Sequence, residues 1–319
     1  MKMKNTLNIL YEDNHVIVVV KEPNILSQGD ATGDIDLLTM VKEYIKEKYN
    51  KPGNVYVGLV HRLDRPVGGI MVFAKSSKAA SRLSEDIKQY VNKLKVIYED
   101  NHIIVVEKFV NIPSQGDTTG DVDMLTIIKS YLKEKYNKPG EVYLGLVHRL
   151  DRPVGGIMVF ARTSKAAGRL SEEVRNKTFE KSYLTIVNGK MEEKSAQLVD
   201  YLWKNPKTNM SYVVDKNKKM AKEAILDYEV LKYDSELNLS VIKVNLHTGR
   251  HHQIRVQLSS RNHSIYGDQK YGGRGHGKQI CLWAYELSFT HPTRKEKLRF
   301  TDLPEKIGSW KIIEDLEVE

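Results

Sequence analysis

The stretch GLVHRLDRPVGGIMVFA occurs twice in the chain, at residues 58–74 and again, letter for letter, at residues 145–161. Around it, residues 7–89 align with residues 94–176 at a constant offset of 87 without a gap, and 59 of the 83 paired positions are identical. Everything after residue 176 occurs once. Two units are too few for a solenoid, which needs at least about three. The pattern indicates a partial tandem duplication.

The repeat predicts two domains of unequal completeness. Residues 1–93 form an incomplete duplicate of an N-terminal half, and residues 94–319 form a complete domain. The junction between them, residues 90–93, contains neither Gly nor Pro, so it is a poor flexible linker.

Composition limits the class of protein. The 319 residues include 50 Lys+Arg and 41 Asp+Glu, a formal net charge of +9, and no apolar run approaches the roughly 18 residues that a membrane span needs. The single cysteine, Cys281, excludes a disulfide framework and fits a reducing cytosol, so we expect a cytoplasmic protein without a membrane partner. The basic balance suggests a polyanionic partner.

Periodicity predicts the fold class. Strands outnumber helices and the helices fall irregularly between them, which is typical of an α+β fold with a mostly antiparallel sheet. Helices are expected at residues 124–136, 164–175 and 251–260. Strands are expected at residues 103–108, 142–148, 157–161, 183–187, 224–232, 239–247 and 282–290.

The repeated stretch also carries the strongest candidate for chemistry. In residues 148–156, HRLDRPVGG, Asp151 lies on a loop rich in Gly and Pro and is flanked by Arg149 and Arg152. A carboxylate placed in this way keeps its charge and stays accessible, so it can act as a nucleophile or as an acid or base. A surface Asp paired with Arg is the competing interpretation.

Two further segments lie in the unrepeated part. In residues 248–255, TGRHHQIR, Arg250 and Arg255 could pair with a carboxylate or bind phosphates, or could simply form a solvated basic face. The neighbouring His247, His251 and His252 lack a carboxylate set, so we expect no metal. In residues 180–187, EKSYLTIV, Tyr183 could stack on a base or be an ordinary sheet aromatic.

Taken together, these motifs resemble a known family. The order HRLDRPVGG, KSYL, TGRHHQIR and YGDQKYG, the last at residues 266–272, is similar to that of the RluA-type RNA pseudouridine synthases across nearly all of residues 94–319. The resemblance departs in two places: Val154-Gly155-Gly156 stands where members often have Thr-Ser-Gly, and Lys108-Phe109 stands where they have Lys-Pro.

The resemblance implies a fold and an activity. It implies a pseudouridine synthase sheet, isomerisation of specific uridines in structured ribosomal or transfer RNA, and no cofactor. It implies a catalytic set of Asp151, Tyr183 and Arg255. It extends to a substrate-binding set of Arg149, Arg152, Arg250, His252, Gln253 and Leu282. A catalytically impaired RNA chaperone with the same fold, and a carboxylate glycosidase without a clear second carboxylate, are the alternatives.

The first copy carries only part of this set. It has Arg62 and Asp64 but no counterpart of Tyr183 or Arg255. Pairing it with the C-terminal half would loop out about 87 residues, which costs roughly 4 kcal/mol. We therefore expect Asp64 and Arg62 to be an inactive duplicate, left to dock on the enzyme, to swap between chains in a dimer, or to stay partly disordered.

Overall fold

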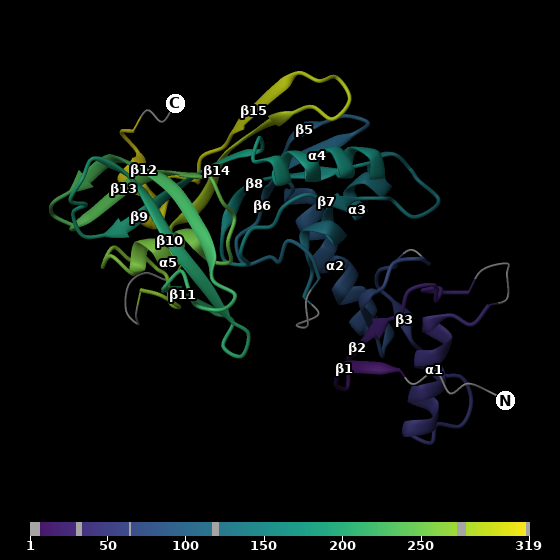
Figure 1. Ribbon diagram of the computed structural model, residues 1–319. Coiled ribbons are helices and arrows are strands. Elements are labelled where there is room, and N and C mark those ends of the chain that lie inside the picture. Colours follow the sequence, from purple (N-terminus) through teal and green to yellow (C-terminus); the bar gives the residue numbers. More distant parts are fainter. Residues whose placement is uncertain (1–6, 30–33, 64, 117–120, 273–278, 317–319) are drawn as a thin grey trace. The chain divides into compact units, whose positions relative to one another are not determined.

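The computed structural model describes residues 7–29, 34–63, 65–116, 121–272 and 279–316 (Figure 1). These residues form two compact units. The first unit consists of residues 1–94 and 113–143, and the second of residues 95–112 and 144–319. Each unit is described by itself.

The first unit contains a four-stranded antiparallel sheet in the order β1-β2-β4-β3. Its elements are β1 (Asn8–Glu12), β2 (Val16–Lys21), α1 (Leu37–Lys48), β3 (Gly58–Leu59), β4 (Gly69–Ala74), α2 (Ser77–Lys93) and α3 (Met124–Lys135). The Asp36 carboxylate begins α1 by accepting from Thr39 N–H, and Asp123 caps α3 through Thr126 in the same way.

One face of this sheet packs on α1. Leu37, Val41 and Ile45 lie at helical spacing and are buried against Ile17 and Phe73. The repeated sequence therefore builds a core of its own in the first copy.

The second unit is built on one large sheet. Its strand order is β11-β10-β12-β13-β9-β14-β8-β6-β5, with β15 paired to β14 and β7 paired to β8. The elements are β5 (Val96–Glu99), β6 (Ile103–Lys108), β7 (Gly145–Leu146), β8 (Gly155–Ala161), α4 (Ser164–Asn176), β9 (Glu180–Asn188), β10 (Ser195–Asn205), β11 (Met210–Val214), β12 (Lys222–Asp234), β13 (Leu239–Leu246), α5 (Gln253–Ser259), β14 (Leu282–Thr290), β15 (Lys297–Thr301) and the 3₁₀-helix η1 (Gly308–Ile313).

The predicted α+β class with a mostly antiparallel sheet is confirmed. One predicted strand, residues 142–148, is wrong in extent, because only β7 (Gly145–Leu146) pairs there. The physical reason lies in His148, whose Nε2 accepts from the Val159 N–H at 3.2 Å. The imidazole of His148 thus accepts the β8 N–H that a backbone carbonyl of a longer β7 would otherwise accept.

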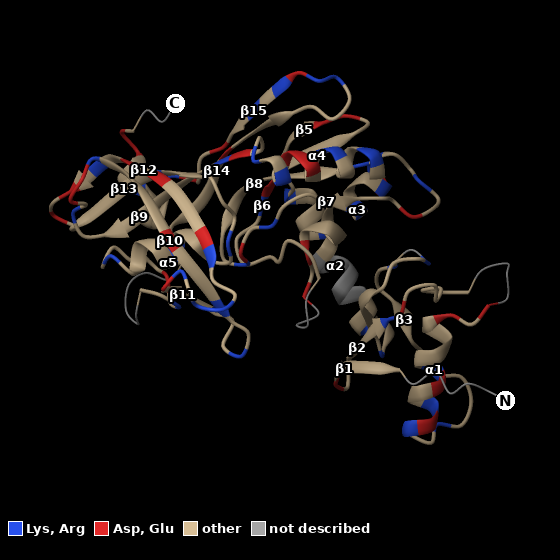
Figure 2. Ribbon diagram, viewed as in Figure 1, with Lys and Arg blue, Asp and Glu red and all other residues tan. Residues whose placement is uncertain are grey.

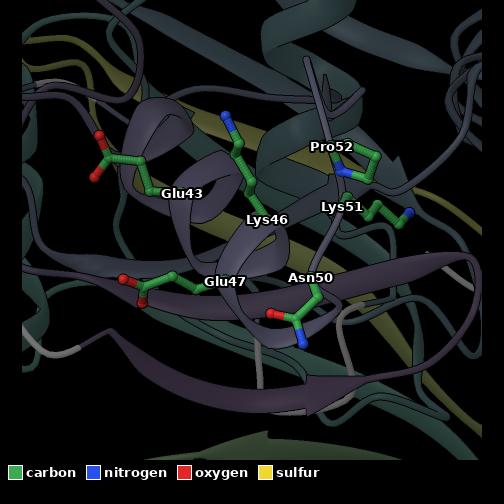
Figure 3. Close-up of a pocket in the computed structure, with 6 residues that line it drawn as sticks. All are labelled: Glu43, Lys46, Glu47, Asn50, Lys51 and Pro52. Atoms are coloured by element: carbon green, nitrogen blue, oxygen red, sulfur yellow. The ribbon is translucent and has the colours of Figure 1, made fainter.

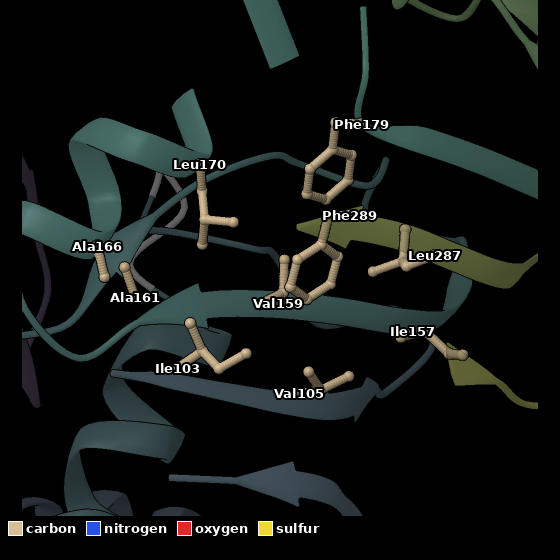
Figure 4. Packing of buried hydrophobic residues seen from close by; sticks show 10 residues of the cluster. All are labelled: Ile103, Val105, Ile157, Val159, Ala161, Ala166, Leu170, Phe179, Leu287 and Phe289. Carbon is tan, nitrogen blue, oxygen red and sulfur yellow. The ribbon is translucent and has the colours of Figure 1, made fainter. Parts of the chain in front are cut away.

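The second unit has two main apolar clusters. One lies where α4 covers β6, β8 and β14, and Figure 4 shows Leu170, Phe179 and Phe289 meeting there. The Phe179 and Phe289 rings are stacked with centroids 5.3 Å apart. The other joins β9, β13 and β14 to η1 through residues such as Trp283 and Ile313. These clusters fix β8, β9 and β14 relative to one another.

A single parallel pairing connects β8 to β14, through Trp283 opposite Gly155 and Ala284 opposite Gly156. Gly156 has φ +114°, and a Cβ added there would lie 2.3 Å from the Ala284 carbonyl oxygen. Only glycine permits this approach of the two backbones. Gly156, the position at which Val-Gly-Gly and Thr-Ser-Gly agree, therefore has a packing reason to be glycine.

Charge and membrane properties follow from the described residues. Figure 2 shows Lys and Arg interleaved with Asp and Glu along α4, and Lys near the turn that joins β10 to β11. In the described part of the chain, no helix combines the length and apolar character needed to cross a bilayer. Among the same residues, no group of three or more His, Cys, Asp or Glu side chains could hold a metal ion.

Candidate active site

A buried lysine holds the loop that carries Asp151 through hydrogen bonds to its backbone carbonyls. Lys108 Nζ, at the end of β6, donates to the carbonyl oxygens of Phe109 at 3.0 Å, Arg152 at 3.0 Å and Val154 at 2.7 Å. Lys108 is fully buried, and this burial lowers its pKa to about 7. The Val154 N–H donates to the Asp151 carbonyl at 3.0 Å, which closes the turn. The Asp151 side chain is left 29% exposed.

Arg255 brings a guanidinium to this carboxylate. Its Nη1 donates to Asp151 Oδ2 at 3.0 Å, while Nε and Nη2 donate to the two oxygens of Asp268 at 2.7 and 2.8 Å. Burial acts to lower the pKa of Arg255, but its hydrogen bonds to Asp268 and the nearby carboxylates leave that pKa raised. Asp268 thus orients the charged guanidinium of Arg255 so that it contacts Asp151.

Tyr183 supplies a phenol on β9. Burial raises the pKa of Tyr183, and the nearby charge of Asp151 raises it further, so the hydroxyl stays protonated. Ala284 and Leu282 on β14 lie opposite Tyr183 and Thr185, so Leu282 shares the sheet face of Tyr183. Leu282 is 5% exposed.

The predicted substrate-binding residues occupy different settings. Arg149 and Arg152 are exposed on the loop, and Arg152 Nε donates to the Asn111 carbonyl at 3.1 Å. Arg250 Nε donates to the Glu223 carbonyl at 2.7 Å. Gln253 is buried, and its Oε1 accepts from the Thr248 hydroxyl and the Arg250 N–H, so it closes the turn before α5. Their roles as substrate contacts stay predictions.

His252 lies within the site. Its Nε2 is 3.5 Å from Asp151 Oδ2, and its Nδ1 is 2.8 Å from the Tyr271 hydroxyl. Burial lowers the pKa of His252 to about 3, so the ring is neutral at physiological pH.

The equivalent loop of the first copy is only partly described. Arg62 is exposed, and its Nη2 lies 2.5 Å from Gln28 Oε1, while Asp64 lies outside the described residues. Lys21 repeats the role of Lys108, since its Nζ donates to the carbonyls of Arg65 and Val67 at 3.1 and 2.6 Å. The local framework of the loop is therefore present in both copies.

A surface hollow in the first unit contains none of the predicted residues. It has a volume of about 480 Å³ and lies at the end of α1. Figure 3 shows that its labelled side chains point in different directions; they are Glu43, Lys46, Glu47, Asn50, Lys51 and Pro52. Nothing in this arrangement brings reactive groups together.

Three residues of the site were missed by sequence reasoning. Asp268, Tyr271 and Lys108 all lie in motifs that the sequence analysis quoted, but none was given a role. For Asp268 no sequence signal was available, because the burial of Arg255, which requires a second anionic partner, is known only from the structure. Lys108 donates to backbone carbonyls, and the Tyr271 hydroxyl contacts the Ser211 N–H and the His252 ring; no sequence pattern reveals these partners.

Comparison with known proteins decides the family. A family model described as RNA pseudouridylate synthase matches residues 15–97 and 102–260. The chain belongs to this family. This pseudouridine synthase is 32% identical over 228 residues to an uncharacterized RNA pseudouridine synthase of Aquifex aeolicus, covering 67% of this chain and 71% of the relative. The alignments with several other relatives cover about two thirds of the relative's length.

The names of two relatives refer to a class of RNA. Ribosomal large subunit pseudouridine synthase D of Neisseria meningitidis is 30% identical over 256 residues, which is 74% of this chain and 64% of that protein. The tRNA pseudouridine synthase C of Haemophilus influenzae is 28% identical, over 65% of this chain and 92% of that protein. As a member of the family, this pseudouridine synthase is an RNA-modifying isomerase.

A solved structure agrees on the fold. Human RNA Pseudouridylate Synthase Domain Containing 4 superposes with a TM-score of 0.59 at 20% identity, covering 69% of this chain and 94% of that chain. At this level of identity the likeness concerns the fold alone.

Proposed function

We propose that Asp151, Tyr183 and Arg255 carry the isomerisation of specific uridines to pseudouridine in structured ribosomal or transfer RNA. The observation that carries the proposal is the 3.0 Å contact between Arg255 Nη1 and Asp151 Oδ2, because it joins the looped carboxylate of the repeated half to the guanidinium of the unrepeated half. The neutral phenol of Tyr183 lies near the same carboxylate.

The reaction conserves the atoms of the nucleotide. The bond from N1 of uracil to C1′ breaks, the base turns, a bond from C5 to C1′ forms, C5 loses its proton and N1 gains one. Asp151 reacts either as a nucleophile at C1′ or as a base toward the ribose, and both routes need an ionised carboxylate. Arg255 favours that ionised form electrostatically.

The substrate side of the proposal rests on charge and on exposed side chains. A uridine must leave its stack to reach a carboxylate on a loop, which costs a few kcal/mol and favours loops or distorted stems. Arg149 and Arg152 flank Asp151 and are exposed, so they are suited to phosphates beside the extruded nucleotide. Leu282 offers an apolar contact on the sheet face of Tyr183. RNA as substrate also favours a cytoplasmic location.

The proposal includes a partial tandem duplication. The series strand, strand, helix, short strand, strand, helix runs from β1 to α2 and again from β5 to α4, in agreement with the sequence repeat. Residues 94–319 are proposed as the complete catalytic domain. Residues 1–93, with Arg62 and Asp64, are proposed as an inactive duplicate, because no second Tyr183 or Arg255 exists for them.

The duplicate also offers a route to a dimer. Gly68 and Gly69 repeat the glycine pair that admits β14 in the second unit, and Val67 beside them is 44% exposed. We include in the proposal that the duplicated segment, residues 1–93, swaps between two chains to make a dimer. Sedimentation of the purified protein tests this part: a monomer at all concentrations contradicts it.

The test of the catalytic proposal uses the duplicated loop as its own control. RNA from cells that lack the gene and express Asp151→Asn or Asp64→Asn is analysed for pseudouridine by mass spectrometry. We expect loss of the modification with Asp151→Asn and none with Asp64→Asn, because Arg255 contacts Asp151 and the first copy has no arginine of its own that corresponds to Arg255. Loss with both variants, or with neither, contradicts the assignment.

A further inference from the structure

The two oxygens of Asp151 have different surroundings. Arg255 Nη1 donates to Oδ2 at 3.0 Å, and His252 Nε2 lies 3.5 Å from that same oxygen. Among the described residues, no side-chain hydrogen bond reaches Oδ1. One oxygen is therefore held by the protein and the other is available to substrate.

The imidazole of His252 is held in one orientation. The ring of His251 stacks on it with centroids 3.7 Å apart, and the ring of Tyr271 meets it edge-on at 5.5 Å. His251 Nδ1 is in turn 2.9 Å from the Ser211 hydroxyl on β11. The backbone of His252 has φ +56°, a left-handed conformation that is strained for a residue other than glycine. Backbone strain of this kind is common where a residue serves a site.

The hydrogen bonds of Tyr271 decide which ring nitrogen of His252 carries the proton. The Tyr271 oxygen accepts from the Ser211 N–H at 2.8 Å and lies 2.8 Å from His252 Nδ1. With its own proton directed at Nδ1, the phenol makes that nitrogen an acceptor. In the neutral ring the proton is then on Nε2, the nitrogen that faces Asp151. A relay runs from Ser211 through Tyr271 and His252 to the carboxylate.

We propose that His252, with its tautomer set by Tyr271, is a positioning residue that holds Oδ2 of Asp151 together with Arg255, so that Oδ1 is the oxygen presented to the ribose of the target uridine. This inference rests on the proposed function. The 3.5 Å separation shortens to a hydrogen bond once the substrate excludes water, since apo contacts of this kind tighten in the complex. A carboxylate free to rotate would exchange its two oxygens and lose that orientation.

The kinetic test compares Tyr271→Phe and His252→Gln in the full-length protein with two matched controls. Tyr233→Phe removes a surface hydroxyl that donates to Asn238, and His247→Gln removes a half-exposed imidazole on β13's C-terminal side. The probe is total RNA from cells that lack the gene, and pseudouridine formed in single turnovers is quantified. We expect both site variants to lower the rate at saturating enzyme about 10- to 100-fold with little change in the half-saturating concentration. The controls keep the wild-type rate.

A spectroscopic readout tests the relay without relying on activity. In protein labelled with ¹⁵N-histidine, the long-range correlation spectrum distinguishes the two neutral tautomers, and His252→Gln assigns the signal. We expect the wild type to carry the proton on Nε2 and Tyr271→Phe to show a mixture. A wild-type ring protonated on Nδ1 overturns the inference, as do site variants with the rate of the controls.

The outcomes separate this inference from the proposed function. If the wild type forms no pseudouridine, the proposed function itself is wrong. If the wild type is active and the variants equal it, only the positioning role is wrong. Should His252→Gln fail to fold, Tyr271→Phe, which deletes one oxygen atom, still decides the matter.

Discussion

Residues 58–74 and 145–161 have the same sequence but different surroundings. In the second copy, β14 lies against Gly155 and Gly156, and Val154 is 2% exposed. In the first copy, Lys21 of β2 pairs with one side of Gly69, and no strand among the described residues pairs with its other side. The preceding valine, Val67, is 44% exposed. The same buried lysine thus contacts the loop in both copies, while the groups that make the loop a site come from elsewhere.

Alanine substitution of the glycine that meets β14 is the strongest test of this difference between the two copies. An alanine Cβ at Gly156 would lie 2.3 Å from the Ala284 carbonyl oxygen, whereas at Gly69 the nearest neighbour is Leu63 Cδ1 at 3.1 Å. We expect Gly156→Ala to cost more than about 3 kcal/mol and to abolish activity, and Gly69→Ala to cost about 1 kcal/mol. Urea unfolding followed by circular dichroism measures both. Equal costs would mean that the β8–β14 contact contributes little.

The buried lysine under each loop provides a second matched pair. Lys108→Met leaves three carbonyl oxygens without their donor beside Asp151, so we expect a loss of about 2–3 kcal/mol of stability and at least about tenfold in turnover. Lys21→Met removes the equivalent donor from the first copy and should leave turnover unchanged. Pseudouridine formation in single turnovers distinguishes them. A fall in turnover with Lys21→Met would implicate the first copy in catalysis.

A charged network found in the first copy predicts a pH dependence. Burial acts to raise the pKa of Glu12, but hydrogen bonds from Lys48, Lys75, Tyr49 and Tyr44 lower it to about 2. Because the folded pKa is below the unfolded value, the stabilisation is complete above about pH 4.5 and is lost as the pH falls toward 2. We expect Glu12→Gln to cost about 2–3 kcal/mol at pH 7 and to remove this acid transition. Hydrogen exchange of β2 amides at pH 7 and pH 3 provides the measurement.

The smallest expected effect concerns the valine before the glycine pair. Val154→Thr buries a hydroxyl at a 2% exposed position and should cost about 1–2 kcal/mol, while Val67→Thr, at 44% exposure, should cost less than about 0.5 kcal/mol. Melting temperatures of the two variants test this difference. A larger cost at Val67 would show that its surface is covered in solution, as the swapped dimer requires.

Sequence reasoning predicted much of the fold because strand and helix periodicity is local. The strand expected at residues 282–290 is observed as β14 with the same bounds, and the helix at residues 124–136 is one residue shorter as α3. The strand at residues 142–148 could not be limited in advance, since His148 ends it through a hydrogen bond to the distant Val159. The strands β10, β11 and β15 were missed entirely, although β10 has 11 residues.

The sequence allowed the motifs of the site to be predicted, but not all of the contacts among their side chains. Asp151, Tyr183 and Arg255 were named from the order of the segments that contain them, and the contact of Asp151 with Arg255 is a feature of the structure. Asp268 was passed over because its pairing with Arg255 depends on the turn after α5 and not on a local pattern. The tautomer of His252 depends on a phenol and a backbone amide from two other segments, which no spacing rule could supply.

The parallel pairing of β8 with β14 uses only two residue pairs, and on the β8 side both residues are glycines. The two glycines leave room for the Trp283 ring beside Gly155 and for the Ala284 backbone beside Gly156. An N-terminal half taken from a relative must therefore keep both glycines, and the apolar β8 side chains that pack with Leu287 and Phe289, to meet β14. Chimeric enzymes that exchange residues 94–161 should keep a continuous sheet while acquiring the loop chemistry of the donor.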